Sequence, residues 1–570
     1  MIDGHMLDCF QGWQEILERI EREIESRTRC VVAIECYPGI FLDDLGLVLR
    51  ARFSTALILD AEDAYKSGSE LEVQFRSKLT DDPVFGFMYP WTIVDFLDAT
   101  LLEQQRKALK NARGLSFIIG TGAACICSHP DILVHAGVIR WEIQQRQRAH
   151  RIGNLGFKNG HESAGQLYKN AFFVDWRVAD RLRHEIYNNI DFFLDLNRQD
   201  EPRMVDGEAL RDAVSQAVLR PFRVVPFFDP GPWGGDWMRR RFCLPDGPPN
   251  YAWCFDCVPE ENSIVLGFGD RRFELPASVL VHEKPEELLG ACVYRRFGAE
   301  FPIRFDFLDT MHGGNLSLQV HPMMEYIREH FGMDYTQDES YYILDCAEGS
   351  ELYLGLRTGV DRTKMRKSLE DAQKGEHPFP AERFVNLWPT RKHDHFPIPA
   401  GTIHCSGKDN VVLEISATPY IFTFKLWDWE RLGLNGKPRP IHLEHGLKNI
   451  QWDRTTEWVR QELIGQVQEV GRGEGWYEER TGLHASEFLE TRRHWFTEQV
   501  PHDTKNNLNV LNLVEGEEAI VESPTGSFPP LHVHYAETFI VPAAVGEYII
   551  RPLLLPRKKP LATIKAYVRE

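Results

Sequence analysis

The chain has 570 residues, with 65 lysine and arginine residues against 84 aspartate and glutamate residues. The resulting formal net charge of −19 argues against nucleic acid or an anionic membrane surface as the main partner. Hydrophobic residues make up 43% of the sequence, which is ordinary for a globular protein, and the length favours three or four domains.

The sequence has the features expected of a cytoplasmic protein. No apolar run reaches the ~18 residues of a membrane-spanning helix. Acidic Asp3 and Asp8 interrupt the N-terminus, where a signal peptide needs an apolar core. The 11 cysteines are scattered and odd in number, so we expect reduced thiols. Cys254 and Cys257 form a lone CxxC pair in an apolar strand pattern, which favours packing over zinc or redox chemistry.

Residues 1–200 alternate between strand and helix patterns. The apolar, β-branched run 30–34 predicts a buried parallel strand, and a helix pattern follows at 41–49. Further strand patterns lie at 55–60 and 115–120. This alternation predicts a doubly wound parallel α/β domain.

The same domain weakly resembles P-loop kinases of the uridine-kinase type. Strand 31–34 stands where the phosphate loop would begin, and Arg146 lies on a helix similar to a kinase lid. The GxxxxGK[ST] loop is missing, however, and Asp43 and Asp44 stand where cations are needed to bind phosphate. We therefore expect a degenerate domain with a structural or regulatory role, in which the Arg146 helix is exposed to solvent.

From about residue 222 the sequence changes to short strands punctuated by Gly and Pro, which is typical of β-sandwiches and barrels. Helix patterns at 323–331 and 364–373 predict helical insertions, and the texture of 444–470 predicts a helical connection to a second barrel. Four domains are predicted. They are an α/β domain at 1–200, a metal-binding β domain at 201–450, a helical connector at 451–495 and a second β domain without a complete metal site at 496–570.

Four side chains of the first β domain suggest a metal site. In the extended stretch 315–322, Gln319 and His321 share one parity and so point to one face. Glu339 begins an apolar strand, where an unpaired carboxylate would be costly to bury, and His404 follows a Pro-Ala-Gly turn. These donors suit a divalent metal, although each histidine by itself also fits a hydrogen-bonded core residue.

These motifs resemble class I (type I) mannose-6-phosphate isomerases, metal-dependent enzymes of the cupin fold, from about Pro221 to the C-terminus. Four segments are similar to the family. They are Phe-Asp-Pro-Gly-Pro-Trp-Gly-Gly at 228–235, the Phe-Pro strand at 301–309, Gln-Val-His-Pro at 319–322 and Ile-Pro-Ala-Gly-Thr-Ile-His at 398–404. The resemblance implies tandem cupin jelly-roll barrels and interconversion of mannose 6-phosphate and fructose 6-phosphate through an enediol. It also implies one Zn²⁺ held by Gln319, His321, Glu339 and His404.

Three positions depart from the family pattern. Lys425 stands where the family commonly has Arg, while Gln337 and Asp306 stand where Lys is frequent. We expect Lys425 to act in catalysis, together with Glu339 and His404, by neutralising a developing enediolate. The lost cations leave two other hypotheses: a cupin that binds metal and sugar without turnover, coupled to a regulatory N-terminal domain, and an isomerase of an unphosphorylated sugar.

Two further histidine pairs resemble metal ligands. His532 and His534 lie in a His-Val-His triplet, but no distant histidine completes a ligand set, so we expect structural roles. His393 and His395 precede the ligand turn, and we expect them to be structural or to line the pocket. The sequence leaves the oligomeric state open.

Overall fold

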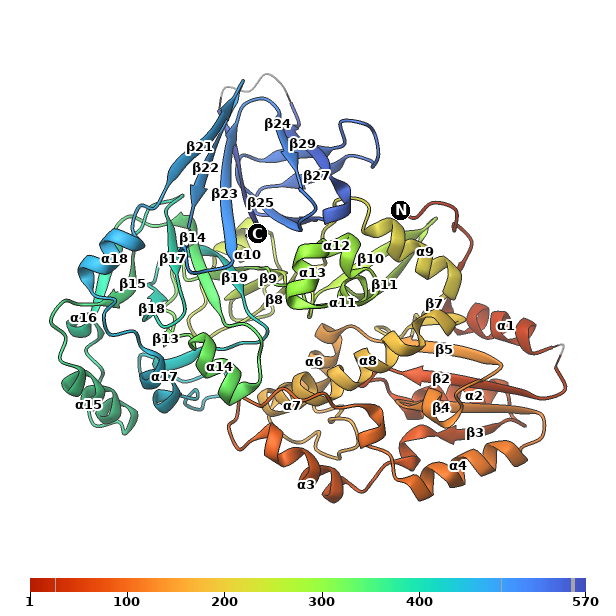
Figure 1. Ribbon diagram of the computed structural model, residues 1–570. Helices are drawn as coiled ribbons and strands as arrows, with labels where there is room; N and C mark the ends of the chain where they lie inside the picture. Colours follow the sequence, from red (N-terminus) through yellow and green to blue (C-terminus); the bar gives the residue numbers. More distant parts are fainter. Residues whose placement is uncertain (26, 483, 555–558, 570) are drawn as a thin grey trace. The chain divides into compact units, whose positions relative to one another are not determined.

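A computed structural model describes residues 1–25, 27–482, 484–554 and 559–569 (Figure 1). The chain divides into two compact units. The first comprises Met1–Gln216 and Glu260–Glu283, so the α/β unit continues beyond residue 200; the second comprises Ala217–Pro259 and Lys284–Glu570. Among the described residues, none of the helices combines the length and apolar character needed to cross a membrane.

The first unit is built on a seven-stranded sheet of order β1-β7-β6-β5-β2-β4-β3. Its parallel part comprises β3 (Leu57–Asp60), β4 (Leu115–Gly120), β2 (Cys30–Cys36), β5 (Ile132–Gly137) and β6 (Phe192–Asp195). Strands β7 (Arg203–Asp206) and β1 (Cys9–Gln11) extend it antiparallel. All seven residues of β2 are buried, as expected for the centre of such a sheet. The predicted parallel α/β architecture is confirmed.

Helices connect these strands. The longer ones are α1 (Gly12–Ile24), α2 (Leu42–Arg52), α3 (Gly68–Leu79), α4 (Ala99–Asn111), α6 (Arg140–Arg148), α7 (Ala164–Asn170), α8 (Trp176–Ile186) and α9 (Gly207–Ala217). The expectation that Arg146 on α6 is exposed is wrong, because its side chain is only 3% exposed. Its guanidinium donates to the carbonyls of Gly39 (2.9 Å) and Leu196 (2.8 Å), which satisfies loop carbonyls that follow β2 and β6.

A cavity of about 440 Å³ opens where β2 ends, at the position of the missing phosphate loop. Four of its lining residues are acidic: Asp43, Asp44, Asp60 and Glu62. Arg151 is the single basic residue among those that line it. Burial and repulsion from Asp60 raise the pKa of Glu62 to about 7. This lining is unsuited to phosphate.

A separate stretch completes the first unit. It contains β10 (Ser263–Phe268), β11 (Arg271–Pro276) and α11 (Ser278–Glu283), and the two strands form a hairpin. The amide of Ile2 donates to the carbonyl of Gly267 (2.8 Å), and Arg271 donates to the carbonyl of Cys9 (2.7 Å). Residues far apart in the sequence therefore form one α/β unit.

The second unit contains two pairs of antiparallel sheets. The first pair has a six-stranded sheet, β17 (His395–Ile398), β14 (Asp338–Cys346), β19 (Asn410–Ala417), β12 (Arg304–Asp309), β9 (Trp253–Cys257) and β8 (Phe227–Asp229). Its partner has five strands, β16 (Val385–Pro389), β15 (Glu351–Leu356), β18 (His404–Ser406), β13 (Leu318–Val320) and β20 (Phe424–Trp427). The predicted helical insertions are α14 (Met324–Phe331) and α15 (Arg362–Gln373).

The second pair of sheets encloses its own core. One sheet has the order β21 (Gln468–Gly473), β22 (Trp476–Thr481), β23 (Leu489–Phe496), β30 (Leu561–Val568), β25 (Asn509–Glu515) and β28 (Thr538–Val541). The other has β24 (Val500–Asp503), β29 (Glu547–Pro552), β26 (Glu518–Glu522) and β27 (Leu531–His534). Side chains of both sheets, such as Leu511 and Val521, form the core between them.

The connector expected at 451–495 is helical only in its first part. Helices α17 (Leu443–Asn449) and α18 (Thr456–Glu462) follow the first pair of sheets, but β21, β22 and most of β23 then occupy 468–495. These strands belong to the second pair of sheets. Gly475, with φ +70°, allows the tight turn between β21 and β22.

Candidate metal centre

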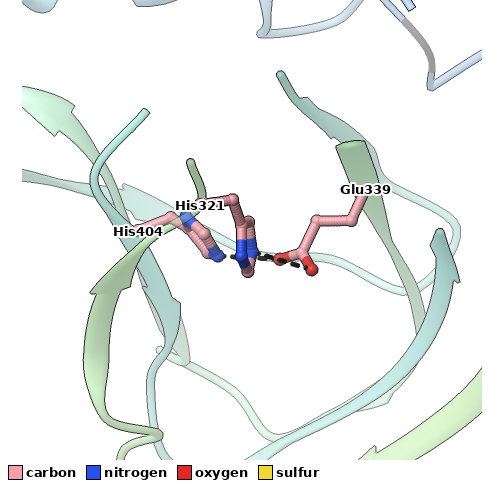
Figure 2. Close-up of side chains that lie close together, drawn as sticks. All are labelled: His321, Glu339 and His404. Carbon is pink, nitrogen blue, oxygen red and sulfur yellow. Dashed lines mark ion pairs between the residues drawn. The ribbon is translucent and has the colours of Figure 1, made fainter. Parts of the chain in front are cut away.

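Three strands of the first β-sheet pair bring the predicted ligands together (Figure 2). Gln319 lies on β13, and His321 follows that strand directly. His404 begins β18, the antiparallel neighbour of β13, and lies opposite Gln319 in the register. Glu339 lies on β14, which belongs to the other sheet. The site therefore lies between the two sheets.

The three ionisable side chains are in direct contact. His321 Nε2 lies 3.0 Å from Glu339 Oε2, and His404 Nε2 lies 2.7 Å from Glu339 Oε1. All three side chains are completely buried. Gln319 is close as well, with its Nε2 3.3 Å from His404 Nε2. Rotation of the amide about its last bond would place Oε1 there instead.

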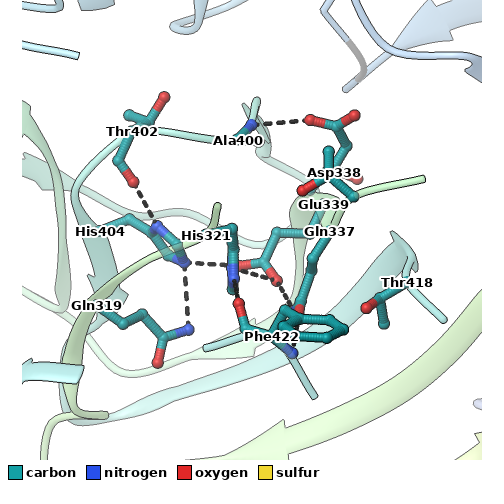
Figure 3. Close-up of polar contacts among 12 residues, drawn as sticks. Gln319, His321, Gln337, Asp338, Glu339, Ala400, Thr402, His404, Thr418 and Phe422 are labelled. Carbon is teal, nitrogen blue, oxygen red and sulfur yellow. Dashed lines mark hydrogen bonds and ion pairs between the residues drawn. The ribbon is translucent and has the colours of Figure 1, made fainter. Parts of the chain in front are cut away.

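The protonation of the histidines is set by their second nitrogens. His321 Nδ1 lies 2.9 Å from the carbonyl oxygen of Phe422, and His404 Nδ1 lies 2.9 Å from that of Thr402 (Figure 3). Because a carbonyl can only accept, each Nδ1 carries a proton, and Nε2 is the nitrogen that faces Glu339. Once deprotonated, each Nε2 would offer its lone pair to a metal on that side. This arrangement is typical of metal-ligating histidines.

The donor set fits a divalent metal. His321 Nε2 and Glu339 Oε1 are buried without a hydrogen bond. One donor atom each from His321, Glu339 and His404 lies within 4.8 Å of the other two. A buried carboxylate needs positive charge beside it, which protonated histidines supply here and which a bound metal would supply in their place. Imidazole nitrogen with carboxylate and amide oxygen suits zinc and related metals.

The electrostatics of Glu339 agree with a charged carboxylate. Burial by itself would raise the pKa of Glu339, but the adjacent His321 and His404 hold this pKa well below its usual range. Glu414, on neighbouring β19, shows the opposite behaviour. Burial, together with repulsion from Asp306 and Glu339, raises the pKa of Glu414 well above its usual range. The pKa values of these two buried carboxyl groups are therefore shifted in opposite directions.

The turn that precedes His404 is fixed by the backbone of the site. Gly401 has φ +86°, and its amide donates to the carbonyl of His321 (3.0 Å). A Cβ atom at Gly401 would lie 2.7 Å from both Met323 Sδ and Gln451 Cγ. The Pro-Ala-Gly turn thus places His404 through a conformation and a close approach that favour glycine.

Lys425 lies beside this cluster. It is on β20, opposite Gln319 of β13, and is partly buried. Burial, and then the nearby Arg439, lower the pKa of Lys425 to about 7. Asp428 accepts hydrogen bonds from Arg431 (2.7 Å) and Arg439 (3.2 Å). Two arginines therefore pair with the Asp428 carboxylate, close enough to Lys425 to affect its pKa.

Sequence reasoning missed Glu414, Arg431 and Arg439 as parts of this site. Glu414 lies in the otherwise apolar strand β19, and an acidic residue in such a strand was the available signal. The two arginines follow the Trp-Asp-Trp segment, but their convergence on Asp428 depends on the loop after β20.

Three of the four histidines in the other pairs, His393, His395 and His534, have side-chain hydrogen-bond partners. His395 contacts Thr481 Oγ1 and Ser340 Oγ, both at 2.9 Å, and His393 contacts the hydroxyl of Tyr342 (2.8 Å). On β27, the side chain of His534 is 52% exposed and lies 3.0 Å from Glu537. These contacts agree with the structural roles expected for the pairs.

Comparison with known proteins gives one family match for the N-terminal part of the chain and several relatives. Residues 12–219 match a family model described as "Domain of unknown function (DUF8485)". The chain is 26% identical over 261 residues to "Probable mannose-6-phosphate isomerase GmuF" of Bacillus subtilis, covering 45% of this chain and 75% of that protein. It is 26% identical over 235 residues to "Mannose-6-phosphate isomerase ManA" of the same organism, covering 41% of this chain and 69% of that protein.

The solved structures that the chain matches include a mannose 6-phosphate isomerase from Bacillus subtilis. The match has a TM-score of 0.49 and 18% sequence identity. It covers 61% of this chain and 100% of the other.

Proposed function

We propose that this protein is a metal-dependent aldose–ketose isomerase that interconverts mannose 6-phosphate and fructose 6-phosphate, or a related pair of sugar phosphates. The observation that carries the proposal is the buried convergence of His321, Glu339 and His404, in which both Nδ1 protons are held by backbone carbonyls. Mannose-6-phosphate isomerases are also the proteins to which the chain is similar in sequence.

In this proposal Gln319, His321, Glu339 and His404 hold one Zn²⁺ ion. When bound, the metal would supply Lewis-acid polarisation of the substrate oxygens. The lowered pKa of Glu339 and the carbonyl contacts that leave each Nε2 facing Glu339 support this ligand set. Glu339 and His404 contribute to catalysis in this way, by holding the metal.

Lys425 contributes a positive charge next to the ligands when its amine is protonated, below its lowered pKa of about 7. Isomerisation moves a proton between adjacent carbons through an enediolate, whose negative charge must be stabilised. The position of Lys425 opposite Gln319 supports a role in that stabilisation. Arg431 and Arg439 lie beyond it and suit the phosphate group of the substrate, because guanidinium groups bind oxyanions through paired donors.

We further propose that the two sheet pairs are cupin-type barrels and that the first unit is a degenerate P-loop-like domain with a regulatory or structural role. The central position of β2 between β4 and β5 supports the second part. The acid-lined cavity at the end of β2 is unsuited to a nucleotide phosphate.

Two alternative functions are favoured by one observation. Gln337, which donates to Glu339, and Asp306 are both buried and supply no positive charge. A site with fewer cations suits a neutral sugar better than a dianionic sugar phosphate. The protein could therefore isomerise an unphosphorylated sugar, or bind metal and sugar without turnover and transmit the bound state to the first unit.

Metal content and isomerase activity on mannose 6-phosphate, measured together, test the proposal. We expect about one zinc ion per chain and measurable turnover in the wild type. His404→Ala should lose the metal and at least about 10³-fold in turnover, since a metal Lewis acid contributes several kcal/mol. The matched control is His534→Ala, which removes a half-exposed histidine from β27 and should change neither quantity.

Each alternative gives a different result. One metal ion per chain without turnover of any sugar, phosphorylated or free, would support a protein that binds metal and sugar without catalysis. Turnover of free mannose but not of mannose 6-phosphate would support an isomerase of an unphosphorylated sugar. Wild-type protein that binds no metal would refute the ligand assignment.

A further inference from the structure

Gln337 closes a ring of contacts around the proposed metal centre (Figure 3). Its Nε2 donates to Glu339 Oε2 at 3.0 Å, and its Oε1 accepts from the backbone amide of Phe422 at 3.1 Å. The carbonyl of the same Phe422 accepts from His321 Nδ1 at 2.9 Å. His321 Nε2 in turn lies 3.0 Å from Glu339 Oε2, where the ring closes.

This ring joins two proposed ligands through one peptide unit and one amide side chain. The side chain of Gln337 is only 6% exposed, so water does not replace its hydrogen bonds freely. Phe422 contributes both its N–H and its C=O groups, and the chain runs on from it to β20 and Lys425. A shift of Gln337 would therefore disturb Glu339 and His321 together.

The position requires a side chain that both donates and accepts. A lysine would donate to Glu339 but could not accept from the Phe422 amide. An ionised glutamate would accept from Phe422 but would repel the carboxylate of Glu339. Methionine has similar length and flexibility but can form neither of these bonds.

We infer that Gln337 is a positioning residue, which fixes the carboxylate of Glu339 and, through the Phe422 peptide, the ring of His321 for metal binding. This inference rests on the proposed metal centre and deepens it. Partners of metal ligands typically contribute 10–100-fold to metal affinity. The neutral amide does this without adding a positive charge that would oppose the binding of a cation.

The test uses the full-length protein and measures the zinc dissociation constant by competition with a chromophoric chelator. Gln337→Met should weaken zinc binding about 10–100-fold. The matched control is Gln144→Met in the first unit. Gln144 is also buried and also donates to a glutamate, Glu261, at 2.9 Å, so this substitution removes an equivalent bond far along the chain from the ligands. Its zinc affinity should equal that of the wild type.

A second variant and a spectroscopic readout separate positioning from general loss of structure. Gln337→Lys keeps a donor for Glu339 but loses the acceptor for the Phe422 amide and adds a positive charge, so it should bind zinc more weakly than the wild type. Cobalt(II) loaded in place of zinc should show altered visible absorption bands in Gln337→Met and wild-type bands in Gln144→Met.

The outcomes are distinct. Suppose that the wild type binds one zinc ion and that the zinc dissociation constant of Gln337→Met is within twofold of the wild-type value. Gln337 then has no positioning role, although the metal centre itself is supported. Equal loss of affinity in Gln337→Met and Gln144→Met would assign the effect to stability and also overturn the inference. If Gln337→Met does not fold, the affinity and cobalt spectrum of Gln337→Lys decide: unchanged values contradict the role. A wild type that binds no zinc refutes the proposed function and the inference with it.

Discussion

At the scale of single residues, Lys425 carries the charge that the proposed reaction needs next to the metal ligands. Lys425→Ala should lower kcat about 10²–10³-fold, as expected when one group that stabilises an oxyanion is removed. Lys425→Arg should recover part of the loss because it keeps the charge but changes the geometry of the donors. Steady-state kinetics on mannose 6-phosphate measures both effects.

Lys448→Ala provides the control for Lys425→Ala. Lys448 is half exposed on α17 and pairs with Glu444 at 2.9 Å, so its removal should leave kcat unchanged. A Lys425→Ala enzyme with the wild-type kcat would show that Lys425 only covers apolar surface with its stem.

The residues of the site differ in how far they could be predicted. His321, Glu339 and His404 each lie in a short local motif, and the structure brings their side chains together. The role of Gln337 was hidden, because its second partner, Phe422, is 85 residues away in the chain. Burial of Arg146 was missed for a similar reason, since its partner Leu196 is 50 residues away.

At the scale of elements, the segment with the Trp-Gly-Gly motif packs tightly against the end of β12. The amide of Gly235 donates to the carbonyl of Asp309 at 2.7 Å. A Cβ atom at Gly235 would lie 2.4 Å from Asp309 Oδ1 and 2.4 Å from the carbonyl oxygen of Met311. Gly235→Ala should therefore lower the free energy of unfolding of the second unit by about 1–3 kcal/mol.

Urea denaturation followed by tryptophan fluorescence measures this effect. Gly247→Ala is the control, because a Cβ atom at Gly247 would meet nothing within 4 Å. Equal stability of the two variants would show that the backbone around Gly235 relaxes without cost.

Elements with a buried face were predicted better than exposed ones. Strand β4 was expected at 115–120 and lies at Leu115–Gly120, where five of its six residues are buried. Strand β21 was missed because its residues are mostly exposed, so it shows no alternation of apolar and polar side chains. Its pairing with β22 places it in the sheet.

At the scale of the whole molecule, the two units should respond separately to pH. In the first unit, burial raises the pKa of Glu62 to about 7. Because this raised pKa makes the folded state hold more protons than the unfolded state, the contribution of Glu62 to stability is present below about pH 4.5 and is lost as the pH rises through about 7. Glu62→Gln should therefore stabilise the first unit by about 1–2 kcal/mol at pH 8 and by almost nothing at pH 4.

Differential scanning calorimetry at several pH values would detect this as a shift of one transition. The transition of the second unit should stay unchanged and serves as the internal control. A stabilisation of equal size at pH 4 and pH 8 would contradict the raised pKa of Glu62.

The division of the first unit between two stretches also affects how the protein is made. Its hairpin β10–β11 and helix α11 come from Glu260–Glu283, after the chain has already begun the second unit at Ala217. A ribosome delivers the chain from the N-terminus at about 5–20 residues per second, and domains generally fold as units during synthesis. The α/β unit must therefore wait, incomplete, until Glu283 has emerged, with the first strands of its neighbour already present.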